Sequence, residues 1–280
     1  MLNIRKMVVE DIASAVKLTD TRNWELTTED FEFMMEMEPE GCFVILDDSK
    51  FIGLTIAVTF ANLGWIGNVI VDRDYRRRGI GSLLIKHSIN YFLSRDVTTI
   101  GLYSYMDVLS FYEKLGFKLD ETFIYLSGSG VQLNKVTTVK RMEDEDFKTA
   151  VNLDRYCIGV SREKLLKGIF AVSKELCYVT YKDNTLIGFV MAAKSSKNVE
   201  IGPLICDSSS EDKAIDLVKA ILRKFIGFNV HIGIPEKQFK MLSALRGLGF
   251  RDNFKVVRMY YGNVPPDKGC IFAMESLERG

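Results

Sequence analysis

The sequence predicts an α/β protein in which two related domains, each a mixed β-sheet between layers of helices, follow one another along the chain. Three observations lead to this prediction. The chain has 280 residues, which is longer than one typical core. Its first half recurs in the second half at an offset of 135 positions. Within each half, β-rich runs alternate with helical patterns, an order typical of helices packed on both faces of a sheet.

The first half contains ten predicted elements. Apolar and β-branched runs predict strands at 2–7, 41–47, 51–60, 64–71, 98–103 and 117–125. Helical spacing of apolar residues predicts helices at 9–18, 28–36, 79–95 and 107–115. Because the helices connect strands that return to one sheet, we predict a three-layer α/β/α domain.

The internal repeat predicts the same elements in the second half. The segment 4–18 aligns with 139–153, and further along 66–67 aligns with 201–202 in the same register. Such agreement over distant segments indicates a duplicated domain.

The boundary between the halves is predicted from composition. Residues 127–130 read Ser-Gly-Ser-Gly, which is typical of a flexible linker. We therefore predict an N-terminal domain at 1–127 and a C-terminal domain at 134–280.

Composition argues against several classes of protein. Lys plus Arg and Asp plus Glu number 37 each, so no bulk charge recruits nucleic acid. Five cysteines without a C-x-x-C pair and only two histidines argue against a disulfide framework, a metal site and a Ser-His-Asp triad. The charged N-terminal segment is unlike a secretory signal. We predict a cytoplasmic protein, monomeric or homodimeric, that binds neither metal nor nucleic acid.

One uncharged stretch has the length of a membrane span. Residues 51–71 contain no charge over 21 positions. The stretch also contains polar residues and three glycines, and a turn signal at 61–64 divides it. We therefore predict two strands here and no membrane helix.

The sharpest pattern lies where a strand meets a helix. An apolar strand ends at Val71, and an amphipathic helix begins near Gly79. The motif Arg76-x-x-Gly79-x-Gly81 therefore lies at a helix N-terminus, where unpaired amides bind anions. Glycine allows close approach to the backbone, and arginine suits phosphate geometry. The motif predicts a pyrophosphate site. A solvated basic turn or a nucleic-acid patch is the alternative for three adjacent arginines.

This motif, with the later run SFYEKLGF at 110–117, resembles the GNAT superfamily of acetyl-CoA-dependent N-acetyltransferases over about residues 3–126. The second half resembles the degenerate GNAT-like half of tandem members, through Leu-Asp-Arg at 153–155 and Ser-Arg at 161–162. The resemblance implies two tandem GNAT-like three-layer domains. It implies transfer of an acetyl group from acetyl-CoA to an amine of a small molecule or peptide, by direct attack in a ternary complex.

The resemblance also implies roles for particular residues. Residues 69–71 would bind the pantetheine arm, and 76–82 the pyrophosphate. Tyr112 would protonate the departing thiolate, because a phenol with a pKa of about 10 is neutral at pH 7. A tyrosine packed in the core is the alternative. The residues expected to bind acetyl-CoA are Val69, Ile70, Val71, Arg76, Arg77, Arg78, Gly79, Ile80, Gly81, Ser82, Asp107 and Ser110. Some members of the superfamily have Asn where this chain has Asp107.

The second half lacks the residues of the cradle. At the offset of 135, the positions of Arg76, Gly79 and Gly81 are taken by Glu211, Ala214 and Asp216. The position that matches Tyr112 falls in 239–245, which contains no tyrosine. The sequence therefore predicts one CoA site per chain.

The acceptor site has fewer sequence signals. Trp24, Asp154, Arg155 and Arg162 are candidates for it, with a core tryptophan and a surface ion pair as the alternatives. Spacing does not distinguish a general base among the acidic candidates, which are Glu25, Asp30, Asp72 and Glu121. The alternative function is a non-catalytic sensor in which bound acetyl-CoA changes a partner interaction.

Overall fold

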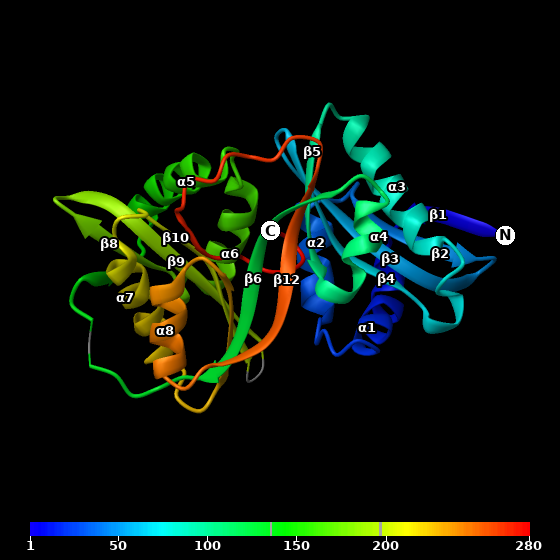
Figure 1. Ribbon diagram of the computed structural model, residues 1–280. Coiled ribbons are helices and arrows are strands. Elements are labelled where there is room, and N and C mark those ends of the chain that lie inside the picture. The colour runs from blue at the N-terminus through cyan, green and yellow to red at the C-terminus, as the bar shows by residue number, and fades with distance from the viewer. Residues whose placement is uncertain (135, 196–197) are drawn as a thin grey trace.

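One continuous sheet runs through both halves of the molecule. The computed structural model of the chain describes residues 1–134, 136–195 and 198–280. The strands follow the order β1-β2-β3-β4-β5-β12-β6-β11-β10-β9-β8-β7, and β13 lies beside β10 (Figure 1). The α/β class predicted from the sequence is confirmed.

The elements of the first half recur in the second in the same order. The first half contains β1 (Leu2–Lys6), α1 (Ile12–Asp20), α2 (Thr28–Met37), β2 (Cys42–Asp47), β3 (Lys50–Phe60), β4 (Leu63–Val71), α3 (Ile80–Leu93), β5 (Thr99–Tyr105), α4 (Leu109–Glu113) and β6 (Lys118–Ser129). The second contains β7 (Val139–Arg141), α5 (Asp144–Ile158), α6 (Glu163–Ser173), β8 (Tyr178–Lys182), β9 (Thr185–Ser195), β10 (Asn198–Cys206), α7 (Glu211–Leu222), β11 (Asn229–Pro235), α8 (Phe239–Gly247), β12 (Arg251–Tyr261) and β13 (Ile271–Ala273).

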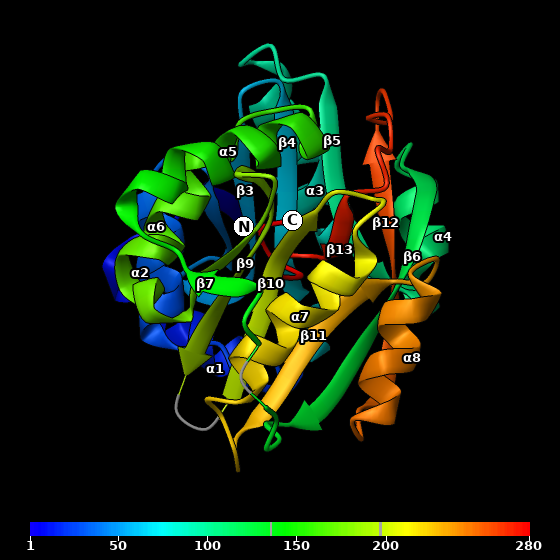
Figure 2. The same ribbon diagram turned by 90° about the vertical axis from the view of Figure 1, so that its left-hand side faces the viewer.

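Helices cover both faces of the sheet, as the three-layer prediction requires. One apolar core joins buried residues of α1, α2, α5 and α6 to one face (Figure 2). On the opposite face, α3 and α4 pack on the first half, and α7 and α8 on the second. The core under α1, α2, α5 and α6 is shared by both halves, because buried side chains of the two halves belong to the same cluster.

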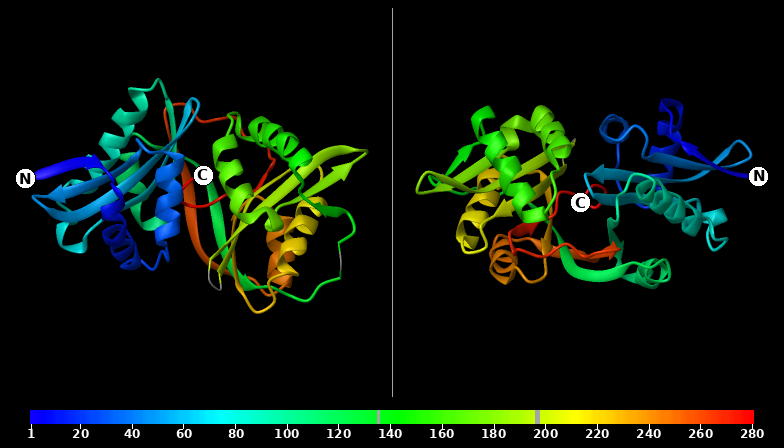
Figure 3. Two further views of the ribbon diagram at one scale, coloured as in Figure 1. Left: turned by 180° about the vertical axis from the view of Figure 1, so that it is seen from behind. Right: turned by 90° about the horizontal axis from the view of Figure 1, so that it is seen from above.

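The final strands of the two halves are exchanged. Strand β6 pairs with β11 of the second half, and β12 pairs with β5 of the first half. The two exchanged strands also pair with each other, with Val256 opposite Phe123. In Figure 3 the green β6 and the orange β12 run together between the two halves. Each half therefore completes its sheet with a strand of the other.

The prediction of a flexible linker at 127–130 is wrong. Residues 127–129 belong to β6, and Ser129 lies opposite Asn229 of β11. The glycine in this stretch has a packing role, since a Cβ on Gly128 would come within 2.6 Å of the Phe250 ring. The strand extends because it must reach the second half of the sheet.

Helices α2 and α6 add a direct contact between the halves. The Phe33 ring packs where Gly168 has no side chain, and a Cβ there would lie 2.4 Å from it. Close by, Lys164 Nζ donates to Glu38 Oε2 at 2.5 Å. Glu38 also accepts from Tyr91 Oη at 2.8 Å, so one carboxylate ties α2, α3 and α6 together.

The uncharged stretch 51–71 forms strands, as predicted, within β3 and β4. Across the described ranges, no helix combines the length and the apolar character that a bilayer crossing requires.

Candidate active site

The site begins where two parallel strands separate. Strands β4 and β5 pair at only three positions, the last being Trp65 opposite Gly101. Beyond that point β4 continues to Val71 and β5 to Tyr105, and a groove of about 990 Å³ opens between them. Among the described residues, no strand pairs with this edge of β4 beyond Trp65, so its backbone groups, apart from the Val71 carbonyl that Arg76 contacts, are available to a ligand.

A β-bulge reshapes β4 inside this groove. Gly67 pairs with Ile56 and Ile70 pairs with Leu54, so β4 has one residue more than β3 over this stretch. Asn68 occupies the bulge with a φ of 52°. Its side chain is 6% exposed and lines the groove, and neither amide atom has a hydrogen-bond partner among the described residues. An unpaired buried amide is costly, so this one indicates a ligand.

Two residues of the predicted anion cradle, Arg76 and Gly81, line the groove. Gly79 has a φ of 79° and begins α3, and no side chain caps the free amides of the first turn. Arg76 lines the groove and its Nε donates to the carbonyl of Val71 at 2.9 Å. A helix N-terminus that lacks a side-chain cap and lies beside an arginine suits a pyrophosphate.

The structure brings together half of the residues expected to bind acetyl-CoA. Those that line the groove are Val69, Ile70, Val71, Arg76, Gly81 and Asp107. Arg77, Arg78 and Ser110 are exposed, and Ile80 is buried in the core beneath α3. Ser82 is half-buried, and Gly79 is the N-cap. Arg78 lies 5.2 Å from the centre of the Tyr75 ring.

Tyr112 lines the groove from α4. Its side chain is 8% exposed, and its ring packs edge-on against Phe111 and Phe117. Burial raises the pKa of the phenol above its ordinary value. The group is therefore a proton donor throughout the neutral range.

The groove passes through the sheet to an aromatic surface on the other face. Tyr105, Tyr125 and Phe254 come from β5, β6 and β12, which the strand exchange makes neighbours. The rings of Tyr125 and Phe254 stack at 4.7 Å between centroids. Trp24, half-buried, lines the same region and packs against the core. Trp24 thus packs against the core and also borders the groove, and its role at the acceptor site stays a prediction.

Two carboxylates that sequence reasoning missed also line the groove. Glu200 lies on β10, and Glu278 lies in the segment that follows β13. Tyr125 Oη donates to Glu200 Oε1 at 3.2 Å. Burial, and then the charge of Glu278, raise the pKa of Glu200 to about 8, and burial likewise raises the pKa of Glu278. No local motif marks them, because the second half reaches the site only through the fold.

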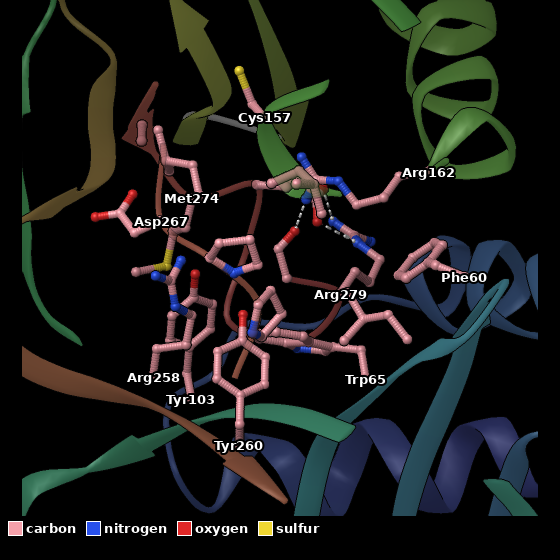
Figure 4. A pocket seen from close by; sticks show the side chains of 18 residues that line it. Phe60, Trp65, Tyr103, Cys157, Arg162, Arg258, Tyr260, Asp267, Met274 and Arg279 are labelled. Carbon is pink, nitrogen blue, oxygen red and sulfur yellow. Dashed lines mark hydrogen bonds and ion pairs between the residues drawn. The ribbon is translucent and has the colours of Figure 1, made fainter. Parts of the chain in front are cut away.

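Asp154 and Arg162 form a buried ion pair, not the surface pair considered above. Arg162 Nη2 lies 2.6 Å from Asp154 Oδ1, and the residues are 4% and 0% exposed. Arg162 also donates to the carbonyl of Gly280. It lines a small cavity of about 40 Å³ beside the groove, together with Arg258 and Arg279 (Figure 4). Arg155 is exposed on α5.

The matching gap in the second half is filled. Strands β10 and β11 pair from Asn198 to Glu200. Beyond this, β13 pairs with β10, and Met274 N donates to Gly233 O of β11 at 3.0 Å. Pro203 occupies the position that aligns with Asn68 and has no N–H to offer. The chain thus occupies the space that stays open between β4 and β5.

Comparisons with known proteins agree with this architecture. Residues 10–117 match the acetyltransferase (GNAT) family, and residues 150–273 match an acetyltransferase (GNAT) domain. Both matches lie inside the domains predicted at 1–127 and 134–280, whose bounds stay a prediction.

Two curated relatives span most of the chain. The N-acetyltransferase YitH of Bacillus subtilis is 27% identical over 225 residues, covering 79% of this chain and 78% of the relative. The holothin acyltransferase of a Pseudoalteromonas species is 24% identical, covering 92% and 87%.

Solved structures share the fold. A candidate acetyltransferase of Pyrococcus horikoshii aligns with a TM-score of 0.84 at 20% identity, covering 100% of this chain and 96% of the other. A tandem GNAT protein from the clavulanic acid biosynthesis pathway aligns with a TM-score of 0.68 at 13% identity, covering 95% and 100%. Both halves match the family and the groove lies where strands separate; the chain belongs to the GNAT family, as an N-acetyltransferase with two GNAT domains in tandem.

Proposed function

We propose that this protein transfers an acetyl group from acetyl-CoA to an amine of a small molecule or peptide, by direct attack within one groove. One observation carries the proposal. The same groove contains the α3 cradle, the Tyr112 phenol and a wall of acidic and aromatic side chains from the second half. The groove would thus hold an anion site, an amine site and a proton donor together.

The residues present fit acetyl-CoA, which would supply the acetyl group as an activated thioester. The amides at the start of α3 and the Arg76 guanidinium would hold its pyrophosphate, with Arg77 and Arg78 adding charge at the exposed mouth. The free edge of β4 at 69–71 would hydrogen-bond the pantetheine arm. The unpaired amide of Asn68 provides a further polar contact inside the groove.

Tyr112 would donate the proton of its phenol to the departing thiolate. Burial keeps that proton on Oη at neutral pH, and the groove gives the group access to the ligand. The cysteines support direct attack. All five are buried, none lines the groove in the described part of the chain, and burial raises the pKa of Cys42 to about 12. Neutral thiols of this kind are poor nucleophiles.

The test is acetylation of a panel of amines by the purified protein. Release of the CoA thiol is followed by absorbance, and the product is identified by mass spectrometry. We expect turnover with at least one amine and no acetylated protein at steady state. Acetyl-CoA binding without turnover of any amine would favour the sensor, and an acetylated protein that forms and decays during turnover would rule out direct attack.

A further inference from the structure

The acceptor end of the groove contains two carboxyl groups that form no ion pair with a basic side chain among the described residues. Glu200 and Glu278 face the groove, and the neighbouring arginines are engaged elsewhere. Arg279 Nη2 pairs with Glu275 at 2.9 Å, and Arg258 Nε pairs with Asp120 at 2.6 Å. Among the described residues, neither groove carboxylate forms an ion pair with a basic side chain.

Other charged groups of the groove are also committed. Asp30 Oδ2 accepts from the backbone and hydroxyl of Thr27, in the capping box of α2. Glu25 Oε2 accepts from Asn198 Nδ2 at 2.7 Å. Lys194 lies over the Phe228 ring, 4.9 Å from its centre. Asp107 also lines the groove without an ion pair among the described residues, but it is exposed. Glu200 and Glu278 are half-buried and are the carboxylates best placed to hold an external cation.

Aromatic faces surround the same space. Tyr125 stacks on Phe254 on one side and on His231 on the other, at 4.7 and 5.9 Å between centroids. Glu200 lies opposite His231 in the register of β10 and β11, which places its carboxylate beside these rings. Both faces of the Tyr125 ring are therefore covered, and the Glu200 carboxylate is the group here that would attract an organic ammonium.

A second polar group points to a ligand in the same groove. The Asn68 amide is buried, faces the groove from the β4 bulge and has no partner among the described residues. It lies on the strand expected to hold the thioester, whereas Glu200 and Glu278 belong to the second half. The groove therefore offers polar groups at two separated points.

Resting on the proposed acetyl transfer, we propose that the acceptor is an organic diamine. One amine is acetylated beside Asn68 and Tyr112, and the second, as an ammonium, is bound by Glu200 and Glu278, close to the Tyr125 hydroxyl that contacts Glu200. The second half of the chain thus selects the acceptor through charge, while the first half binds acetyl-CoA.

This arrangement makes binding sensitive to pH. Burial and the charges of Glu278 and Glu275 raise the pKa of Glu200 to about 8, against the opposing effects of Arg279 and the Tyr125 hydroxyl. The pair of carboxyl groups therefore retains a proton at pH 7, and a bound ammonium displaces it. Affinity for a diamine should rise as the pH rises through about 8, until the ammonium itself deprotonates near about 10.

The experiment compares amines that differ only at the far end. Diamines from diaminopropane to diaminohexane are titrated calorimetrically into the full chain saturated with CoA, each against the alkylamine of equal length and the matching amino acid with a terminal carboxylate. The best diamine should bind about tenfold or more tightly than its alkylamine, as a charge-assisted contact predicts. The amino acid should bind more weakly than either.

Variants distinguish a role of these two carboxylates in diamine binding from a general effect of losing a carboxylate. Glu200→Gln and Glu278→Gln should remove the preference for the diamine and leave CoA affinity unchanged. For Glu200→Gln, proton release, read from the dependence of the heat on the buffer, should also disappear. Glu236→Gln changes an exposed carboxylate paired with Lys255 and should behave like the wild type.

The experiment distinguishes failure of the proposed acetyl transfer from failure of the diamine proposal. If CoA does not bind, the proposed function fails. If CoA binds but no diamine exceeds its alkylamine, including the case in which neither binds, the diamine proposal is overturned while acetyl transfer stands.

Discussion

At the scale of single residues, Tyr112 and Asn68 are polar residues that the fold buries beside the groove, and the Asn68 amide has no hydrogen-bond partner among the described residues. Tyr112 was predicted from its motif, whereas Asn68 became visible only when the β-bulge placed it in the groove. Their burial makes sense if a ligand completes their contacts.

Replacing Tyr112 by Phe tests the proton donor. The ring contacts with Phe111 and Phe117 survive, so the protein should fold and bind acetyl-CoA normally. Turnover should fall by about a hundredfold or more, because general acid catalysis contributes on that order. Initial rates of thiol release and calorimetric affinities measure the two effects. Tyr156→Phe, at an exposed position, is the control; undiminished turnover in Tyr112→Phe would remove the residue from the mechanism.

The buried pair of Asp154 and Arg162 should be important for stability. Asp154→Ala leaves the Arg162 guanidinium buried without its carboxylate and should lower the free energy of unfolding by about 3–5 kcal/mol. Asp212→Ala removes a carboxylate from an exposed pair with Lys240 and should change little. Urea denaturation compares both with the wild type. Equal small effects would mean that the Asp154 pair is not important for stability.

The raised pKa of Glu200 predicts a pH-dependent stability. Its folded value of about 8 lies above the ordinary value of 4.5, so the folded state loses stability as the pH rises between them. Glu200→Gln should therefore raise the melting temperature at pH 8 and have little effect at pH 5. Differential scanning calorimetry at both pH values decides this, and an equal shift at both would show that Glu200 ionises normally.

The part of the site that comes from the first half of the chain could largely be predicted from the sequence. The part that comes from the second half could not. The cradle could be predicted because arginine and glycine spacing at a helix start has a local physical meaning. Tyr125, Glu200 and Glu278 carry no such pattern. They come together only in the folded sheet, where residues more than 70 positions apart, such as Tyr125 and Glu200, make contact.

At the scale of elements, the helix bounds follow from local signals and the strand partners do not. The helix predicted at 79–95 is observed as α3 at Ile80–Leu93. The exchange of β6 and β12 could not be predicted, because alternation of side chains defines a strand but not its neighbour. The contrast between the open gap at β4 and the gap filled by β13 likewise depends on pairing.

The start of α3 gives a test at this scale. Gly79 has a φ of 79° with open space around it, so Gly79→Ala introduces backbone strain without a clash. It should cost about 1 kcal/mol in stability and weaken acetyl-CoA binding by disturbing the cradle. Gly247→Ala, also without neighbours but in the last turn of α8, is the matched control and should be neutral. Thermal denaturation and calorimetric affinity are the measurements; equal behaviour of the two variants would contradict a special role for Gly79.

At the scale of the whole molecule, the exchanged strands and the shared core make the two halves one folding unit. Each half needs a strand of the other, and buried residues of both form a single cluster. The tandem organisation was predicted from the repeat, but the predicted flexible linker gave no indication that the halves exchange strands.

Calorimetric unfolding should therefore show one cooperative transition, which acetyl-CoA shifts as a whole to higher temperature. Two separate transitions, with only one of them responding to acetyl-CoA, would show that the halves fold independently.

A single acetyl-CoA site, at the start of α3 and the free edge of β4, is the central proposal for this protein. Titration calorimetry of the full chain with acetyl-CoA tests it directly. We predict one saturable site per chain, lost in the variant with Arg76→Glu and Gly81→Asp and kept in Lys86→Glu, which changes an exposed residue of the same helix. No saturable heat, two sites per chain, or unchanged binding by the double variant would contradict the account.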